Sequence, residues 1–318
     1  MNLRLSFIVP FYNVEPYIEE CIRSLYAQDI PWDEYEVICV DDCSPDGSRA
    51  IVERLQREYP TLQLLTTPEN LRQGGARNMA LDVARGRYVF FVDSDDYIKP
   101  NCLAALLKQA ENENLDILDF DFESDAIGES NGMYKNPVSY SMGVCTGDDY
   151  VFDSRIHWAN KCSSVCAMLI RRDFIETHNL RFVEKKQFED TDFSMKMFSS
   201  AKRVMHIGDR LYLYRHHTSS ATHSTPDFNN IYYRVEAIKR FIQLYRSNKN
   251  TRWGVAIQEI IKNDTYELLY ILRQTSLKNR CCFYVRRLGY IRSLRLFVGK
   301  KVILALNSLV LLHYFYKK

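Results

Sequence analysis

Short apolar runs alternate with amphipathic segments from the start of the chain to about residue 112. The runs at residues 4–9, 36–40, 62–66 and 88–92 are nearly continuously apolar, which predicts buried strands. The segments at residues 15–28, 48–58, 76–85 and 100–112 repeat their apolar positions at helical spacing. Strands of this kind that alternate with helices are typical of a parallel sheet covered on both faces. The predicted fold class is therefore α/β.

The pattern is less regular after residue 112. Residues 115–150 predict strand-like pieces between polar loops, and residues 157–170 run into an apolar patch. A helix with an acidic start is predicted at residues 187–200, and strands at 204–214. From Asp227 onward the pattern is helical. We expect a first domain over residues 1–225 and a helical C-terminal region over 226–318, divided near residues 224–228.

Composition and charge exclude several classes of protein. The chain has 318 residues, 46% hydrophobic and 26% charged, which predicts a folded protein, and its net charge of +2 does not suggest a nucleic-acid partner. Its nine cysteines show no metal-like pairing, so we expect free thiols in a reducing compartment. The N-terminus has no signal-peptide pattern, which favours a cytoplasmic protein.

Residues 281–318 form a basic tail with eight lysines and arginines and no acid. Apolar residues recur in it at helical spacing, but the apolar stretch is shorter than the roughly 20 residues needed to cross a bilayer. Two interpretations remain open. The tail lies in a membrane interface, which we favour, or it packs as a helix on residues 230–275.

Carboxylates follow two of the predicted strands directly. Asp41 and Asp42 follow one, and Asp93, Asp95 and Asp96 follow another. In α/β sheets, ligands bind outside the carboxyl ends of the strands. A divalent cation with a diphosphate would neutralise such a cluster, whereas a solvated loop or helix cap is the plainer alternative for each acidic run.

The segment NLRQGGARN at residues 70–78 precedes a predicted helix. It matches neither a dinucleotide-binding fingerprint nor a P-loop. Its glycines allow close backbone approach, and Arg72 and Arg77 could face a diphosphate or the acidic cluster.

Five motifs in order resemble family 2 glycosyltransferases of the GT-A fold: SFIVPFYN, EVICVDDCSPDGS, NLRQGGARN, YVFFVDSDD and FEDTDF. The resemblance covers about residues 5–217. It implies a Rossmann-like, mostly parallel sheet flanked by helices, with the helical region as an extension. It also implies transfer of a sugar from a nucleotide-diphosphate donor with inversion, aided by Mn²⁺ or Mg²⁺.

The resemblance also assigns roles to residues. It places Asp190 as the general base, although an acidic first turn of a helix is the alternative. The metal contacts that it implies are Asp95, Asp96 and, as the weakest match, His217, which His216 rivals. The donor-nucleotide contacts that it implies are Pro10, Tyr12, Asp41, Asp42, Arg72 and Asp93.

The expected activity is transfer from a UDP-sugar to a hydroxyl of a glycan or lipid-linked acceptor in surface-polysaccharide synthesis, at the inner face of the cell membrane. One alternative is a nucleotidyltransferase that makes nucleotide sugars. Its usual Gly-rich, basic loop after the first strand is replaced here by Pro10-Phe11-Tyr12-Asn13. Another is a catalytically inactive, membrane-attached glycan-binding protein, against which the intact acidic motifs argue.

Overall fold

The computed structural model describes residues 3–124, 140–153, 164–216, 228–274 and Leu294. They divide into two compact units. The first comprises residues 1–185 and 189–217, and the second residues 186–188 and 218–318. The predicted boundary near 224–228 falls largely on residues outside the described ranges and stays a prediction, as does the basic tail, of which the structure describes Leu294 alone. None of the described helices is long and apolar enough to cross a membrane.

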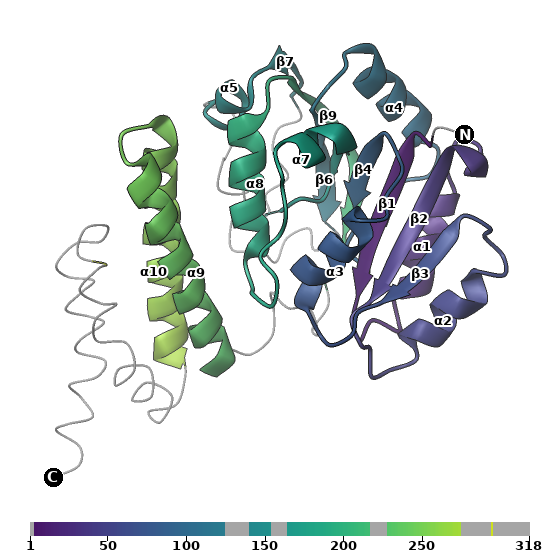
Figure 1. Cartoon of the computed structure of the whole chain (residues 1–318), viewed down its shortest axis with the longest axis horizontal. Coiled ribbons are helices and arrows are strands. Elements are labelled where there is room, and N and C mark those ends of the chain that lie inside the picture. Colours follow the sequence, from purple (N-terminus) through teal and green to yellow (C-terminus); the bar gives the residue numbers. More distant parts are fainter. Residues whose placement is uncertain (1–2, 125–139, 154–163, 217–227, 275–293, 295–318) are drawn as a thin grey trace, which may run out of the picture. The chain divides into compact units, whose positions relative to one another are not determined.

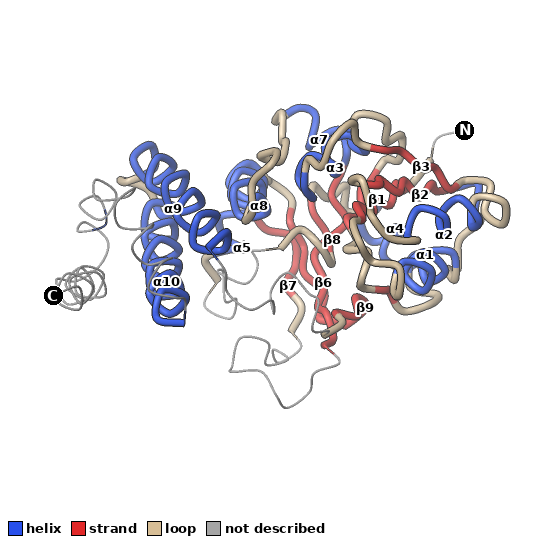
Figure 2. Tube along the Cα trace, turned by 90° about the horizontal axis from the view of Figure 1, so that it is seen from below, coloured by secondary structure: helices blue, strands red, loops and turns tan. Residues whose placement is uncertain are grey.

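One sheet forms the centre of the first unit, and helices cover both of its faces (Figures 1 and 2). The strands are β1 (Leu5–Phe11), β2 (Tyr35–Asp41), β3 (Leu62–Thr66), β4 (Tyr88–Phe91), β5 (Tyr97–Ile98), β6 (Ile117–Ser124), β7 (Met142–Cys145), β8 (Met168–Arg171) and β9 (Val204–Tyr214). The helices of this unit are α1 (Ile18–Tyr26), α2 (Ser48–Leu55), α3 (Arg72–Leu81), α4 (Leu103–Asn112), α5 (Gly147–Val151), α7 (Arg172–Thr177) and α8 (Glu189–Ser200), with a 3-10 turn at Trp32–Glu34.

The first four strands of the order β3-β2-β1-β4-β8-β6-β9-β5 are parallel, as predicted. β8 then lies between β4 and β6 and runs antiparallel to both, while β6 and β9 are parallel to each other. β7 and β5 each pair with β9 in antiparallel fashion. The α/β prediction is confirmed, but the second half of the sheet is mixed.

The two faces of β1 and β2 bury alternate residues against different helices. Phe7, Val9 and Val37 belong to the core under α1, α2 and α4, and Ile8 and Ile38 are equally buried toward the other face, which α3 covers. Figure 2 shows the strands between these two helical layers. Strands buried on both faces explain the continuous apolar runs of the sequence.

Pro10 lies inside β1, whereas the sequence predicts that the strand stops there. The strand continues to Phe11, and Pro10 pairs with Val40. The last bond from β4 to β1 joins the amide of Val92 to the carbonyl of Ile8 at 3.0 Å. Pro10 faces the same side two residues later, where β4 has ended, so the strand tolerates its missing N–H.

The second unit contains α9 (Phe228–Asn248) and α10 (Arg252–Gln274), as the helical pattern predicts. The two helices pack on each other. Arg234 of α9 pairs with Asp264 of α10 at 2.5 Å.

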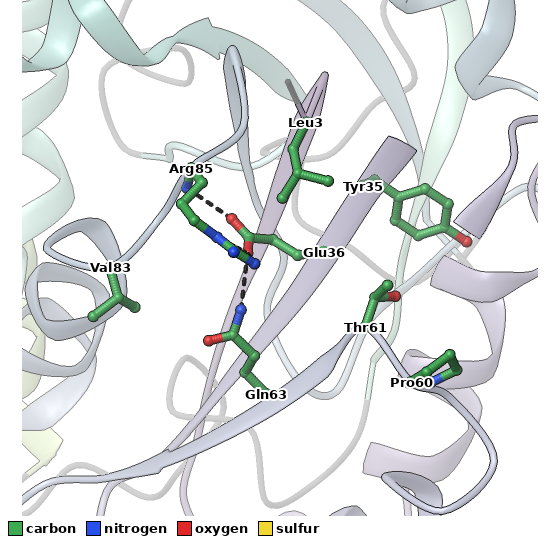
Figure 3. A pocket seen from close by; sticks show the side chains of 8 residues that line it. All are labelled: Leu3, Tyr35, Glu36, Pro60, Thr61, Gln63, Val83 and Arg85. Carbon is green, nitrogen blue, oxygen red and sulfur yellow. Dashed lines mark hydrogen bonds and ion pairs between the residues drawn. The ribbon is translucent and has the colours of Figure 1, made fainter. Parts of the chain in front are cut away.

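A buried carboxylate marks the amino end of the sheet. Glu36, at the start of β2, is 1% exposed. It accepts a hydrogen bond from Ser6 Oγ at 2.7 Å. It also accepts from Gln63 Nε2 at 2.8 Å and from the backbone and guanidinium of Arg85 (Figure 3). The pocket around these residues therefore opens at the opposite end of β2 from Asp41 and Asp42.

Replacing Glu36 with alanine should lower the free energy of unfolding by about 3 kcal/mol, because the donor groups of three residues lose a buried charged acceptor. The matched variant Glu53→Ala removes a half-exposed partner of Arg49 and should change stability little. Urea unfolding compares the two. Equal effects would contradict a structural role for the Glu36 network.

Candidate functional site

The carboxyl ends of β1, β2 and β4 lie at one edge of the sheet because these strands are parallel neighbours. This edge carries Tyr12 after β1, Asp42 after β2, and Asp93 after β4. Tyr12 is 50% exposed, whereas Asp41 and Asp42 are buried. The structure thus brings together the acidic motifs that the sequence placed in one crevice.

Asp41 and Asp42 hold different parts of this edge. Asp41 accepts a hydrogen bond from the backbone amide of Ser44 at 2.8 Å, which forms the turn after β2. Asp42 reaches the other way. Its Oδ1 accepts from Thr67 Oγ1 and from the amide of Leu71, both at 2.8 Å. Asp42 therefore ties the end of β2 to the loop that leads into Arg72.

α3 begins at Arg72, earlier than the predicted start at residue 76, so Gly74 and Gly75 lie inside the helix. Gly74 is required by close packing: a Cβ there would come within 2.8 Å of the carbonyl oxygen of Val183 and 3.0 Å of Glu189 Cγ. Gly74 therefore lets the first turn of α3 approach the segment before α8, while a Cβ on Gly75 would meet Leu71 at the start of the helix.

The carboxylates after β4 have unequal surroundings. Asp96 is 1% exposed; its Oδ2 accepts from the hydroxyl of Tyr212 at 2.6 Å and its Oδ1 from the amide of Arg215 at 2.9 Å. Burial, with the charges of Asp93 and Asp95, raises the pKa of the Asp96 carboxyl. Asp93 and Asp95 are partly exposed. The geometry therefore leaves these two nearer to solvent than Asp96, whose metal role stays a prediction.

Tyr212 and Arg215 support this acidic loop, and the sequence did not single out either. The Tyr212 hydroxyl also accepts from the backbone amide of Asp93 at 3.1 Å. The Arg215 guanidinium lies over the rings of Tyr17 and Tyr97, at 5.2 and 5.0 Å from their centroids. An arginine and a tyrosine at the end of an apolar strand, in YLYR, were the available signal.

Arg77 joins the acidic loop to the start of α8. Its Nη2 donates to Asp93 Oδ1 at 2.9 Å, and its Nη1 donates to Asp190 Oδ1 at 2.6 Å and Glu189 Oε1 at 3.0 Å. The side chain of Arg77 is 1% exposed. The sequence left open whether Arg77 faces a diphosphate or the acidic cluster, and the structure shows that it faces the acidic cluster.

Asp190 is the second residue of α8, and its side chain keeps 21% of its exposure. The removal of water from around it raises the pKa of Asp190 to about 8; Arg77 opposes this shift, and the negative charges of Glu189 and Asp93 add to it. Three carboxylates share one guanidinium, so their mutual repulsion favours a protonated form. Asp190 thus has the properties of a proton acceptor that works near neutral pH.

The structure gives less information on the predicted metal contact His217 and its rival His216. His217 lies outside the described residues, and its rival His216 packs edge-on against Tyr214 at 5.0 Å. Within the described ranges, no three His, Cys, Asp or Glu side chains are grouped so that they could hold a metal ion by themselves. Carboxylates at one strand end still suit Mg²⁺ or Mn²⁺, which commonly use one or two of them and complete their shell with phosphate oxygens.

A family model described as "Glycosyl transferase family 2" matches residues 6–178. The chain belongs to this family. As a family 2 glycosyltransferase it is an enzyme, which confirms the class predicted from the five motifs and excludes the nucleotidyltransferase alternative.

Relatives and solved structures agree with this membership. The chain is 34% identical over 225 residues to the uncharacterized glycosyltransferase EpsJ of Bacillus subtilis (strain 168), covering 69% of this chain and 62% of EpsJ. It is 33% identical over 239 residues to the poly(ribitol-phosphate) beta-N-acetylglucosaminyltransferase TarS of Staphylococcus aureus (strain MW2), covering 72% of this chain and 39% of TarS. It thus spans less than two thirds of either relative.

The crystal structure of S. aureus TarS 1–349 in complex with UDP superposes with a TM-score of 0.66 at 24% identity, covering 97% of this chain and 88% of that one. A mannosyltransferase from Pyrobaculum calidifontis, in complex with GDP-Man and Mn²⁺, superposes with a TM-score of 0.53 at 17% identity, covering 98% and 88%. These likenesses confirm the GT-A fold.

The variant Tyr212→Phe should lower the free energy of unfolding by about 2 kcal/mol, since the buried Asp96 carboxyl loses a hydrogen bond and the amide of Asp93 loses its acceptor. Tyr26→Phe is the matched control, because it removes a hydroxyl bonded to the neutral Thr61 at 3.1 Å and should lose about half as much. Urea unfolding measures both, and a smaller effect at Tyr212 than at Tyr26 would refute the supporting role.

Proposed function

We propose that this family 2 glycosyltransferase moves a sugar from a nucleoside diphosphate, with UDP as the expected carrier, to a hydroxyl of a glycan or lipid-linked acceptor, with inversion. The observation that carries the proposal is the bridge by Arg77 between Asp93 and Asp190. Asp93 follows a strand end typical of nucleotide binding, and Asp190 lies 113 positions after Arg77 in the sequence. The same guanidinium bonds both carboxylates, so it holds them close together. Transfer needs both groups at one site.

Asp190 acts as the general base in this proposal. The acceptor hydroxyl attacks the anomeric carbon and gives its proton to the carboxylate, while the bond from that carbon to the diphosphate oxygen breaks. Asp190 retains exposed surface through which a hydroxyl can approach. Its raised pKa makes the carboxylate a stronger proton acceptor than an ordinary aspartate.

The donor is assigned to the edge formed by Pro10, Tyr12, Asp42, Arg72 and Asp93. Asp42 is fixed by Thr67 and by the amide of Leu71, which would hold it in place for a nucleobase or ribose. Asp41, whose carboxylate accepts from Ser44, would shape the turn beneath the nucleotide. Solved structures of S. aureus TarS with UDP and with UDP-GlcNAc support a uridine carrier for this fold.

A divalent cation, Mn²⁺ or Mg²⁺, would neutralise the charge that develops on the leaving diphosphate. Asp95 and Asp96 would hold it; Asp95 is partly exposed, and Tyr212 and the amide of Arg215 hold Asp96 in the loop. The P. calidifontis enzyme, in complex with GDP-Man and Mn²⁺, supports this assignment by analogy.

The acceptor is proposed to be a hydroxyl-bearing polymer of the cell surface. TarS is named as a poly(ribitol-phosphate) beta-N-acetylglucosaminyltransferase, and ribitol units carry hydroxyls, which supports an acceptor of this chemical class. We place the enzyme on the cytoplasmic side of the cell membrane, where the basic tail would attract anionic lipids. Fractionation of chains with and without residues 281–318 tests this location.

Asp190→Asn should reduce turnover of a UDP-sugar by about 10²–10⁴-fold, because the amide cannot accept the acceptor's proton. Binding of UDP with Mn²⁺, measured by calorimetry, should be preserved. Glu176→Gln, on the half-exposed carboxylate of α7 that pairs with Arg181, is the matched control and should retain full turnover. Undiminished turnover in Asp190→Asn would remove Asp190 from its assigned role.

The rate should depend on pH in a defined direction. Since Asp190 must be ionised to accept a proton and its pKa is raised to about 8, kcat/KM should rise with pH below that value, approaching tenfold per unit, and level off above it. UDP affinity measured over the same range is the control. A rate that stays constant from about pH 6 to 8 would contradict the raised pKa as a property of the base.

A further inference from the structure

Arg77 extends from α3 into the interior of the first unit, where its side chain is 1% exposed. Its guanidinium lies 5.2 Å from the centroid of the Phe182 ring, and Phe182 stacks on Phe193 at 4.0 Å with the rings nearly parallel. Phe91, at the end of β4, meets both rings edge-on. These aromatic contacts come from β4, from α8 and from the segment before α8, so they restrict where the guanidinium can go.

The two arms of the guanidinium serve different partners. Nη2 contacts Asp93 on the donor side, and Nη1 contacts Asp190 and Glu189 on the acceptor side. A guanidinium is planar and rigid, so two oxygens bonded to its two arms are held at a set separation. A lysine ammonium is a single point on a flexible stem and does not impose this spacing.

We infer that Arg77 is a positioning residue for glycosyl transfer, because it fixes Oδ1 of Asp190 relative to Oδ1 of Asp93 and so aims the base at the donor's anomeric carbon. This inference rests on the proposed function and deepens it. Within the described residues, the bond to Arg77 is the only hydrogen bond of the Asp190 side chain, and it uses Oδ1. The second oxygen is thereby directed toward the acceptor hydroxyl.

The charge balance argues against a purely stabilising role. One buried guanidinium faces Glu189, Asp190 and Asp93, so the group carries an excess of negative charge in a region with little water. Well-packed apolar side chains of similar volume would often be at least as stable as such a buried ionic group. The ionic group fixes the distance between the base and the donor side, which apolar packing would not do.

The test compares Arg77→Lys with Arg85→Lys. Arg85 also donates two guanidinium nitrogens to a buried carboxylate, Glu36, but at the amino end of the sheet. Arg77→Lys should reduce kcat by about 10²-fold, the loss expected for a displacement near 1 Å, while the Kd for UDP with Mn²⁺ changes less than about threefold. Arg85→Lys should leave both unchanged.

Two other variants retain arginine at position 77 and change its neighbours. Phe182→Leu removes the ring beside Arg77 and should lower kcat more than it changes UDP affinity; it is the informative variant if Arg77→Lys fails to fold. Glu189→Gln removes a negative neighbour and should move the inflection of the rate–pH profile to lower pH, because Asp190 then faces Arg77 with one fewer competing carboxylate. An unchanged inflection would contradict the sharing of the Arg77 charge between Glu189 and Asp190.

The outcomes separate this inference from the proposed function. If Asp190→Asn abolishes turnover while folded Arg77→Lys retains wild-type kcat, the positioning role is wrong and the base assignment stands. If kcat and UDP affinity fall in equal proportion in Arg77→Lys, or in Phe182→Leu where the lysine variant does not fold, Arg77 maintains the whole site and the positioning role is again overturned. If Asp190→Asn is fully active, the proposed base itself fails.

Discussion

One guanidinium shared by three carboxylates sets the geometry at the carboxyl end of this enzyme's sheet. Arg77 comes from α3, Asp93 follows β4, and Glu189 and Asp190 begin α8, so three elements must converge on one buried cation. The Arg77 side chain is 1% exposed, so breaking one of these pairs would leave buried charge uncompensated at a large penalty, and this restricts how far any of the three elements can shift. Gly74 also restricts the position of α3, because a side chain there would clash with Val183 and Glu189 and force the helix away. Close backbone approach and buried charge therefore specify one arrangement.

The acids at the edge of the sheet divide into buried ones that build the site and partly exposed ones. Asp41 forms a turn, Asp42 anchors the loop before Arg72, and Asp96 is held by Tyr212 and Arg215. Asp93 and Asp95 keep partial exposure. A run of carboxylates can therefore follow a buried strand without unfolding the loop, since its deepest member receives hydrogen bonds and Asp93 faces an arginine. A cation with a diphosphate would complete the neutralisation at the exposed members.

The sequence predicted the parallel half of the sheet closely because its signals are local. β1 to β4 lie within two residues of the apolar runs that predicted them. The insertion of β8 between β4 and β6 is different in kind: Val89 pairs with Ile170, and no local periodicity encodes a partner so far along the chain. Local chemistry also misled at α3, where Gly74 and Gly75 suggested a loop but serve close packing inside a helix. In the site, the motif order indicated Asp190, whereas the part of Arg77 in holding it needed three-dimensional contacts.

The same contacts explain how an aspartate beside an arginine could still be an effective base. An isolated ion pair with Arg77 would lower the pKa of Asp190 and make it a poor proton acceptor. Glu189 and Asp93 divide the positive charge, and the scarcity of water penalises the ionised form, so the net shift is upward, to about 8. A simple salt bridge would orient Asp190 but reduce its basicity. Here Asp190 is both oriented by Arg77 and basic. The surplus of carboxylates around one guanidinium makes that combination possible.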